Sequence, residues 1–91
     1  MAAAGPQITI YTRALCGYCS AARELLDSKG VDYHELDTTL NSKLRAEMKA
    51  RSGRDTVPQI FIEDQHIGGY DDMAALDAAG ELDGLLNGGS D

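Results

Sequence analysis

Two cysteines separated by two residues, Cys16 and Cys19, form the most reactive motif in this 91-residue sequence. They follow an alternating apolar and polar run, Gln7–Thr12, which predicts a β-strand. They precede a segment up to Lys29 whose apolar residues share one helical face, which predicts a helix. A thiol at a helix N-terminus meets unpaired backbone N–H groups and the positive end of the helix dipole, both of which stabilise its thiolate. The motif therefore indicates redox or metal chemistry at a strand–helix junction.

Cys16 is the better nucleophile of the two, because it precedes the helix and its sulfur can stay exposed. Cys19 lies about one turn into the helix. Residues three apart on a helical turn come within the roughly 4.4–6.8 Å between Cα atoms that a disulfide requires. We predict that Cys16 forms a mixed disulfide with a substrate and that Cys19 resolves it by intramolecular attack.

Three other uses of the thiols compete with this interpretation. A zinc site would need two more ligands, and His34 and His66 lie too far apart in the sequence to form a usual ligand pair. Exposed thiolates also bind Cu(I). Cysteine can finally serve as inert core filler, although a glycine- and tyrosine-containing turn is a poor place to bury two thiols.

The remaining chain predicts alternating elements that position this motif. The order is βαβαββα, an α/β fold with a four-stranded mixed sheet flanked by helices on both faces. The first two strands would be parallel through a right-handed crossover, and the last two would form a hairpin. We expect one domain over residues 1–91, with its core at about residues 7–86. The further segments are a strand at Val31–Leu36, a helix at Asn41–Ser52, strands at Val57–Ile62 and Gln65–Gly68, and a final helix capped by Asp71 or Asp72 and followed by a short helical turn near Leu82–Leu86.

Three segments together resemble the signature segments of the dithiol glutaredoxins. They are TRALCGYC at Thr12–Cys19, TVPQIFI at Thr56–Ile62 and HIGGYDD at His66–Asp72, in order and at matching separations from about Ile8 to Leu86. The resemblance implies a thioredoxin-like fold and a glutathione-dependent thiol–disulfide oxidoreductase. Such an enzyme reduces protein–glutathione mixed disulfides and protein disulfides. The lack of a tryptophan beside the motif argues against a thioredoxin proper.

The resemblance also implies the roles of individual residues. Cys16 takes up the glutathionyl group, and either a second glutathione or Cys19 removes it. Arg13 meets the glycine carboxylate, and a cis Val57–Pro58 bond turns the Val57 backbone outward to pair with the cysteinyl part like an added strand. The N–H groups at the start of the final helix, with Asp71 or Asp72, hold the γ-glutamyl end. One of these acids could equally be only the helix N-cap. The implied glutathione-binding residues are Arg13, Tyr18, Thr56, Val57, Pro58, Gly69, Tyr70, Asp71 and Asp72.

Gly17 departs from the commonest dithiol pattern, which has proline at this position. Some relatives that lack this proline resemble carriers of a [2Fe-2S] cluster, which leaves a second function open. The ligands would then be Cys16 of two subunits and two glutathiones, and without a cluster we expect no metal site. A copper-chaperone interpretation is weaker, because Ala14 stands where that group has methionine.

Charge and composition narrow the partners. The net charge is -7, and residues 55–91 contain no lysine or arginine. Nucleic-acid binding depends on basic residues that neutralise phosphates, so we expect no nucleic acid as a partner. Met1–Pro6 lacks the basic and apolar regions of a secretory signal, and no stretch is long enough to span a membrane. We expect a monomeric cytoplasmic protein whose partners are glutathione and glutathionylated or disulfide-containing proteins.

Overall fold

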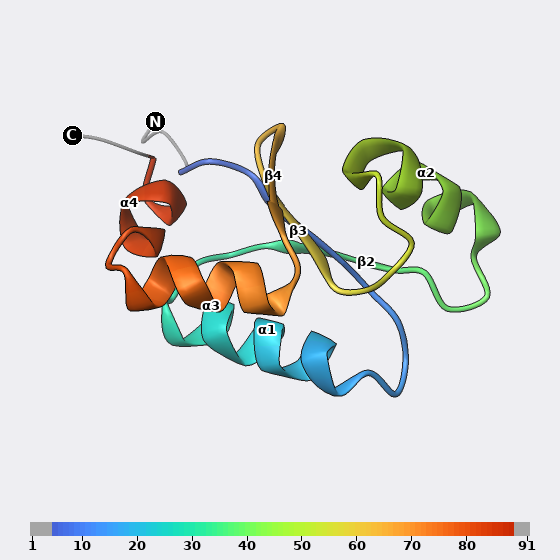
Figure 1. Cartoon of the computed structure of the whole chain (residues 1–91), viewed down its shortest axis with the longest axis horizontal. Helices are drawn as coiled ribbons and strands as arrows, with labels where there is room; N and C mark the ends of the chain where they lie inside the picture. Colours follow the sequence, from blue (N-terminus) through green and yellow to red (C-terminus); the bar gives the residue numbers. More distant parts are fainter. Residues whose placement is uncertain (1–4, 89–91) are drawn as a thin grey trace.

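The computed structural model describes residues 5–88, in which helices cover both faces of a four-stranded sheet (Figure 1). The predicted order of elements is confirmed, with the last helical region divided into two helices. The elements are β1 (Ile8–Thr12), α1 (Gly17–Ser28), β2 (His34–Asp37), α2 (Ser42–Ser52), β3 (Gln59–Ile62), β4 (Gln65–Gly68), α3 (Tyr70–Ala78) and α4 (Leu82–Leu86).

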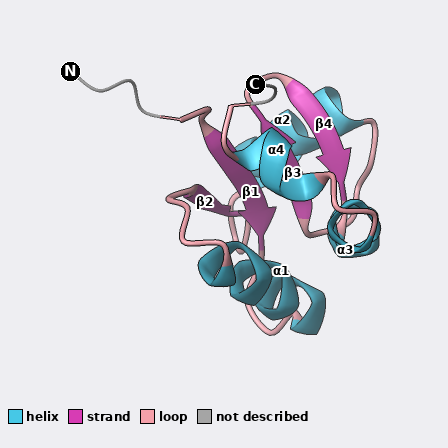
Figure 2. Ribbon diagram, turned by 90° about the vertical axis from the view of Figure 1, so that its left-hand side faces the viewer, coloured by secondary structure: helices cyan, strands magenta, loops and turns pink. Residues whose placement is uncertain are grey.

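The sheet is mixed, with the strand order β2-β1-β3-β4 (Figure 2). β1 and β2 are parallel, and α1 connects them as the crossover helix. β1 pairs antiparallel with β3, and β3 pairs antiparallel with β4 across the predicted hairpin. This is the thioredoxin-like α/β arrangement that the sequence predicts.

Side chains that alternate along the strands divide the core between the two faces. Ile8 and Ile10 point to the face that is covered by α1, α3 and α4, whereas Tyr11 points to the face covered by α2. The larger cluster also contains Ala22, Leu26, Ile60, Ile62, Met73, Leu82 and Leu86. The smaller cluster adds Met48 and Phe61 to Tyr11. Three helices therefore share the main core, and α2 contributes chiefly Met48.

The start of α1 differs from the sequence-based boundary. The helix begins at Gly17, because Cys16 itself is the N-cap and accepts the Cys19 N–H through its sulfur. β2 begins at His34 instead of Val31, where its pairing with β1 starts. β3 begins at Gln59, which leaves Thr56–Pro58 in a loop that enters the strand.

The predicted cap of α3 is wrong. Gly69 is the N-cap, and neither Asp71 nor Asp72 precedes the helix. Asp72 lies in the first turn and its carboxylate accepts the Gly69 N–H at 3.0 Å, which is the acidic half of a capping box. The extended backbone of Gly69 allows this helix to start directly after β4.

Lys29, the C-cap residue of α1, forms ion pairs with two acids from residues 55–91, the part of the chain that has no lysine or arginine. Its Nζ lies 2.5 Å from Asp77 Oδ1 of α3 and 2.9 Å from Asp83 Oδ1 of α4. These carboxylates raise the pKa of the Lys29 ammonium.

Within residues 5–88, no helix has the length and apolar character needed to cross a membrane.

Candidate active site

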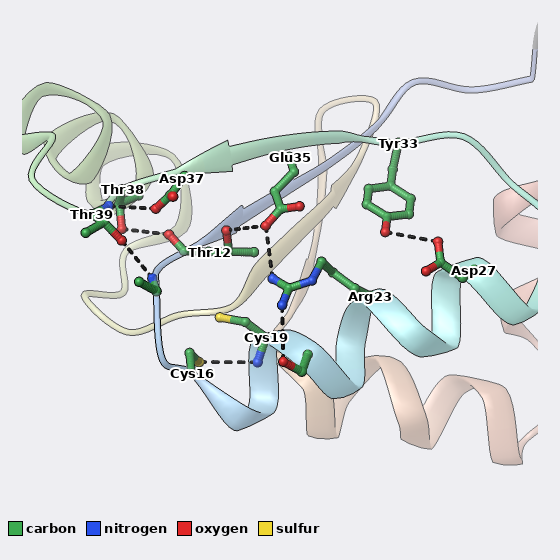
Figure 3. Close-up of polar contacts among 12 residues, drawn as sticks. Thr12, Cys16, Cys19, Arg23, Asp27, Tyr33, Glu35, Asp37, Thr38 and Thr39 are labelled. Carbon is green, nitrogen blue, oxygen red and sulfur yellow. Dashed lines mark hydrogen bonds and ion pairs between the residues drawn. The ribbon is translucent and has the colours of Figure 1, made fainter.

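Cys16 lies where the chain leaves β1 and enters α1. Its Sγ accepts a hydrogen bond from the Cys19 N–H at 3.2 Å (Figure 3). Its carbonyl accepts the Ser20 N–H at 3.1 Å. The sulfur thus replaces the oxygen of a usual N-cap side chain. An N–H donor and the positive end of the helix dipole both lie at this partly exposed sulfur.

Cys19 has the opposite surroundings. Its side chain is fully buried, and burial raises its pKa to about 12, with a further increase from the hydrogen bond to Cys16. At neutral pH Cys19 is therefore a thiol. The two cysteines are both free and differ in exposure, since Cys16 is partly exposed and Cys19 is buried.

A hollow of about 530 Å³, here called the β2 hollow, opens beside Cys16 on the side of β2. Arg13, Gly17, Arg23 and Glu35 are among its lining residues. The Arg23 guanidinium donates to Glu35 Oε2 at 3.0 Å and to the Ser20 hydroxyl at 3.1 Å (Figure 3). Most of the charge in this hollow is therefore already paired within the protein.

A second depression, the α3 groove, reaches the same turn at Tyr18, shares no lining residue with the β2 hollow and has a volume of about 220 Å³. Tyr18 forms the wall nearest the cysteines, and its ring lies 6.3 Å from that of Tyr70 at the start of α3. Eight of the nine predicted glutathione-binding residues line this groove. The complete lining is Tyr18, Arg54, Thr56, Val57, Pro58, Gln59, Gly69, Tyr70, Asp71 and Asp72.

The floor of the α3 groove offers unpaired backbone groups. The Val57–Pro58 peptide bond is cis, as the family resemblance implies. Among residues 5–88, no hydrogen bond involves the N–H or the C=O of Val57. The first turn of α3, from Tyr70 onward, adds helix N–H donors that have no partner within the helix. A peptide-like ligand could form hydrogen bonds with both the Val57 backbone and the N–H groups at the start of α3.

Charged groups border the same groove. Asp72 Oδ2 lies 3.1 Å from Arg54 Nη1 and also accepts the Gly69 N–H. The Gly69 N–H and then the Arg54 guanidinium lower the pKa of Asp72, so this carboxylate stays ionised. Gly68 makes the arrangement possible, because a Cβ at this position would come within 2.2 Å of Asp72 Oδ2.

Arg13 is the one predicted glutathione-binding residue outside the α3 groove. Its exposed side chain belongs to the loop after β1, on the β2 hollow side of Cys16. Conversely, Arg54 and Gln59 line the groove without being among the predicted residues. Their signal is weak in the sequence, since Arg54 lies in a loop among other charges and Gln59 resembles an ordinary strand residue.

No group of three or more His, Cys, Asp or Glu side chains in residues 5–88 could hold a metal ion. His34 and His66 lie on β2 and β4, the two opposite edges of the sheet. This separation keeps the two histidines from meeting at one site.

A helix-capping cysteine followed three residues later by a buried one, on this fold, defines a thiol–disulfide oxidoreductase of the thioredoxin-like class. Within that class, the sequence model of the glutaredoxin family matches residues 8–67, and the chain belongs to that family. Glutaredoxin 3 of Escherichia coli (strain K12) is 58% identical over 79 residues, which cover 87% of this chain and 95% of that protein.

Solved structures agree with this assignment. A glutaredoxin from Brucella melitensis superimposes with a TM-score of 0.82 at 48% identity, covering 93% of this chain and 92% of its own. A buckwheat glutaredoxin–glutathione complex superimposes with a TM-score of 0.78 at 29% identity, covering 87% of this chain and 74% of its own. The chain is thus a thiol–disulfide oxidoreductase with a redox-active cysteine pair.

Proposed function

We propose that this protein uses glutathione to reduce glutathionylated proteins and protein disulfides through Cys16 and Cys19. The observation that carries the proposal is the unpaired Val57 backbone in a groove next to the Cys16 turn. A tripeptide can pair with such an edge as an added strand. The glutathione complex of the buckwheat relative supports the same ligand here.

The ends of glutathione match the remaining groups of the groove. Its γ-glutamyl carboxylate would accept from the N–H groups at the start of α3, and its ammonium would meet Asp71 or Asp72. Thr56, Pro58, Gly69 and the two tyrosines would shape the walls. Arg13 would approach the glycine carboxylate from the far side of Cys16, an assignment that rests on the family resemblance.

The first chemical step is attack of the Cys16 thiolate on the glutathionyl sulfur of a mixed disulfide. A bond forms between the two sulfurs, the substrate S–S bond breaks, and the substrate protein leaves as a thiolate that takes up a proton. A second glutathione thiolate then attacks the bound glutathionyl sulfur. This releases glutathione disulfide and restores the Cys16 thiolate.

Cys19 acts when the substrate is a protein disulfide. In the mixed disulfide between Cys16 and the substrate, the Cys16 sulfur carries no charge, so its contribution to the high pKa of Cys19 disappears. Cys19 then loses its proton more easily and attacks the Cys16 sulfur, which expels the substrate thiolate and forms the Cys16–Cys19 disulfide. Two glutathiones reduce that disulfide to the dithiol.

The [2Fe-2S] alternative has less support from the chain itself. Such a cluster needs four ligands, usually thiolates, and only Cys16 presents a partly exposed sulfur while Cys19 is buried and protonated. A cluster would therefore require a second copy of the chain and external thiols.

Thiol–disulfide exchange driven by glutathione needs a reducing compartment. This requirement supports a cytoplasmic location, as predicted from the two cysteines.

Two single substitutions test the proposed function. Cys16→Ser should abolish reduction of a glutathionylated peptide in a glutathione-coupled assay, because the hydroxyl is not a nucleophile at neutral pH. Cys19→Ser, the matched control, should retain this activity and lose the reduction of protein disulfides. Iodoacetamide at pH 7 should label Cys16 and not Cys19 in the reduced protein. Activity that survives in Cys16→Ser would refute the assignment.

A further inference from the structure

A buried amide lies directly behind the α3 groove. Gln59, the first residue of β3, is 1% exposed. Its Nε2 donates to the Thr56 carbonyl at 3.0 Å and to the Thr56 hydroxyl at 3.3 Å. Among residues 5–88, these are the only hydrogen bonds made to Thr56. Within the described residues, Gln59 is thus the hydrogen-bonding partner that holds Thr56, while the next residue, Val57, packs on the smaller core cluster.

The orientation of the Gln59 amide follows from its partners. A backbone carbonyl can only accept, so the NH2 group must face Thr56 and Oε1 must point the other way. Oε1 lies 2.7 Å from His66 Nε2. Since Oε1 can only accept, His66 Nε2 must carry a proton. Both the neutral Nε2–H tautomer and the imidazolium meet this condition.

His66 is held in place from β4. It pairs with Phe61 across the β3–β4 ladder, and the two rings lie 4.9 Å apart between centroids with an interplanar angle of 32°. His66 is half-buried and is absent from the lining of the α3 groove. Its hydrogen bond to the groove goes to Gln59, and it also interacts through charge with Arg54 and Asp72.

We propose that His66 is a positioning residue for glutathione binding: its Nε2–H fixes the Gln59 amide, which holds Thr56 so that Val57 presents its backbone to the ligand. This inference rests on the proposed function. Without the His66 donor, Gln59 Oε1 is a buried acceptor with no partner, and the amide gains by rotating toward another donor. Rotation would release the Thr56 carbonyl and loosen the loop. Cys16 lies on a different element, so its reactivity should not change.

The test compares three variants in the glutathione-coupled assay with a glutathionylated peptide. His66→Leu removes the donor and should raise the KM for glutathione and for the peptide about fivefold, with kcat changed by less than about twofold. His66→Gln keeps an N–H donor near the Nε2 position and should restore both KM values to within about twofold of the unsubstituted protein. His34→Leu, the same change on the opposite edge strand, should have no effect.

Two further readouts separate positioning from general loss of structure. The rate of Cys16 alkylation by iodoacetamide should be the same in all variants. The side-chain amide signals of Gln59 in an NMR spectrum should shift in His66→Leu and return in His66→Gln, with or without glutathione. If His66→Leu fails to fold, His66→Met keeps a flexible apolar side chain against Phe61 and serves the same comparison.

Each outcome has a distinct meaning. Unchanged KM values in His66→Leu would overturn the inference, and so would a His66→Gln variant as weak as His66→Leu. If the unsubstituted protein shows no saturable use of glutathione, the proposed function itself fails. In that case the Gln59 amide signals still report whether His66 holds the amide.

Discussion

The α3 groove and the β2 hollow both border the Cys16–Cys19 turn, yet they differ in the polar groups that they leave free for a ligand. The β2 hollow is the larger, at about 530 Å³ against about 220 Å³. Its charges are largely paired, since Arg23 binds Glu35 and Asp37 accepts the Thr39 N–H at 2.8 Å. The groove instead leaves the Val57 backbone unpaired. Unpaired backbone groups, more than volume, suit a site to a peptide.

The Arg54–Asp72 ion pair of the groove can also separate more easily than the Arg23–Glu35 ion pair of the β2 hollow. The Arg54 and Asp72 side chains are 48% and 47% exposed, so water competes for both charges and the pair contributes little to stability. Arg23 and Glu35 are less exposed, and Glu35 is further held by the Thr12 hydroxyl at 2.8 Å. A ligand can therefore separate Arg54 from Asp72, whereas the β2 hollow resists rearrangement.

Of the variants that separate the two depressions, Gly68→Ala should have the largest effect, because it displaces a side chain of the groove and leaves the β2 hollow intact. Gly68 has a φ of 119°, and the added Cβ would collide with the Asp72 carboxylate. Displacing Asp72 removes the acid from the groove and exposes the start of α3. We expect the KM for glutathione to rise roughly tenfold and the free energy of unfolding to fall by about 2 kcal/mol. Enzyme assays and urea denaturation measure the two effects.

Gly30→Ala is the matched control for this prediction. Gly30 also has a positive φ, 71°, but no heavy atom lies within 4 Å of the position that its added Cβ would take, so only backbone strain is added. It should cost about 1 kcal/mol of stability and leave the KM for glutathione unchanged. A similar rise in KM in both variants would show that strain, and not the displaced carboxylate, weakens binding.

On the other side of the turn, Gly17→Pro should stabilise the protein and leave the groove intact. Gly17 is the first residue of α1, where proline is favoured, and Cys16 at φ -120° and ψ 109° lies near the region that a following proline requires. No heavy atom lies within 4 Å of a Cβ at Gly17. We expect a gain of about 1 kcal/mol, which raises Tm by about 4–8 °C in calorimetry.

Gly17→Ala adds the Cβ without the ring and should gain less. The KM for glutathione should stay constant in both variants, because Gly17 lines the β2 hollow and not the groove. A changed KM would mean that the turn couples the two depressions.

The sequence predicts the groove better than the exact start of its elements. Local patterns are sufficient for the order of elements along the chain and for the Cys-x-x-Cys junction, because alternation and helical spacing are encoded in neighbouring residues. Eight predicted glutathione-binding residues converge on the groove, since the resemblance covers three separated segments. The prediction for the cap of α3 is wrong because Asp71 and Asp72 are favoured N-cap types, whereas the helix begins earlier, at Tyr70 after the Gly69 cap.

Two further features of the structure are missed in the sequence because they depend on contacts between residues far apart in the chain. The link from His66 to Gln59 and Thr56 joins β4, β3 and the preceding loop, and no spacing rule in the sequence connects these residues. Similarly, the pairing of Lys29 with Asp77 and Asp83 shows that part of the acidic second half is balanced by the first half only in the folded protein.

The smallest predicted effect is a change in the KM for glutathione when one cation of either depression is removed. Arg54→Ala removes a cation from the groove and should raise the KM for glutathione about threefold, a size typical of one exposed charge pair. Arg13→Ala removes the cation on the side of the β2 hollow and should raise it less, because the ligand must reach past Cys16 to meet it. Both KM values should converge toward that of the unsubstituted protein at high salt, which screens exposed charges. The reverse ranking would mean that the glycine end of glutathione crosses the Cys16 turn, so that the two depressions form one continuous binding site.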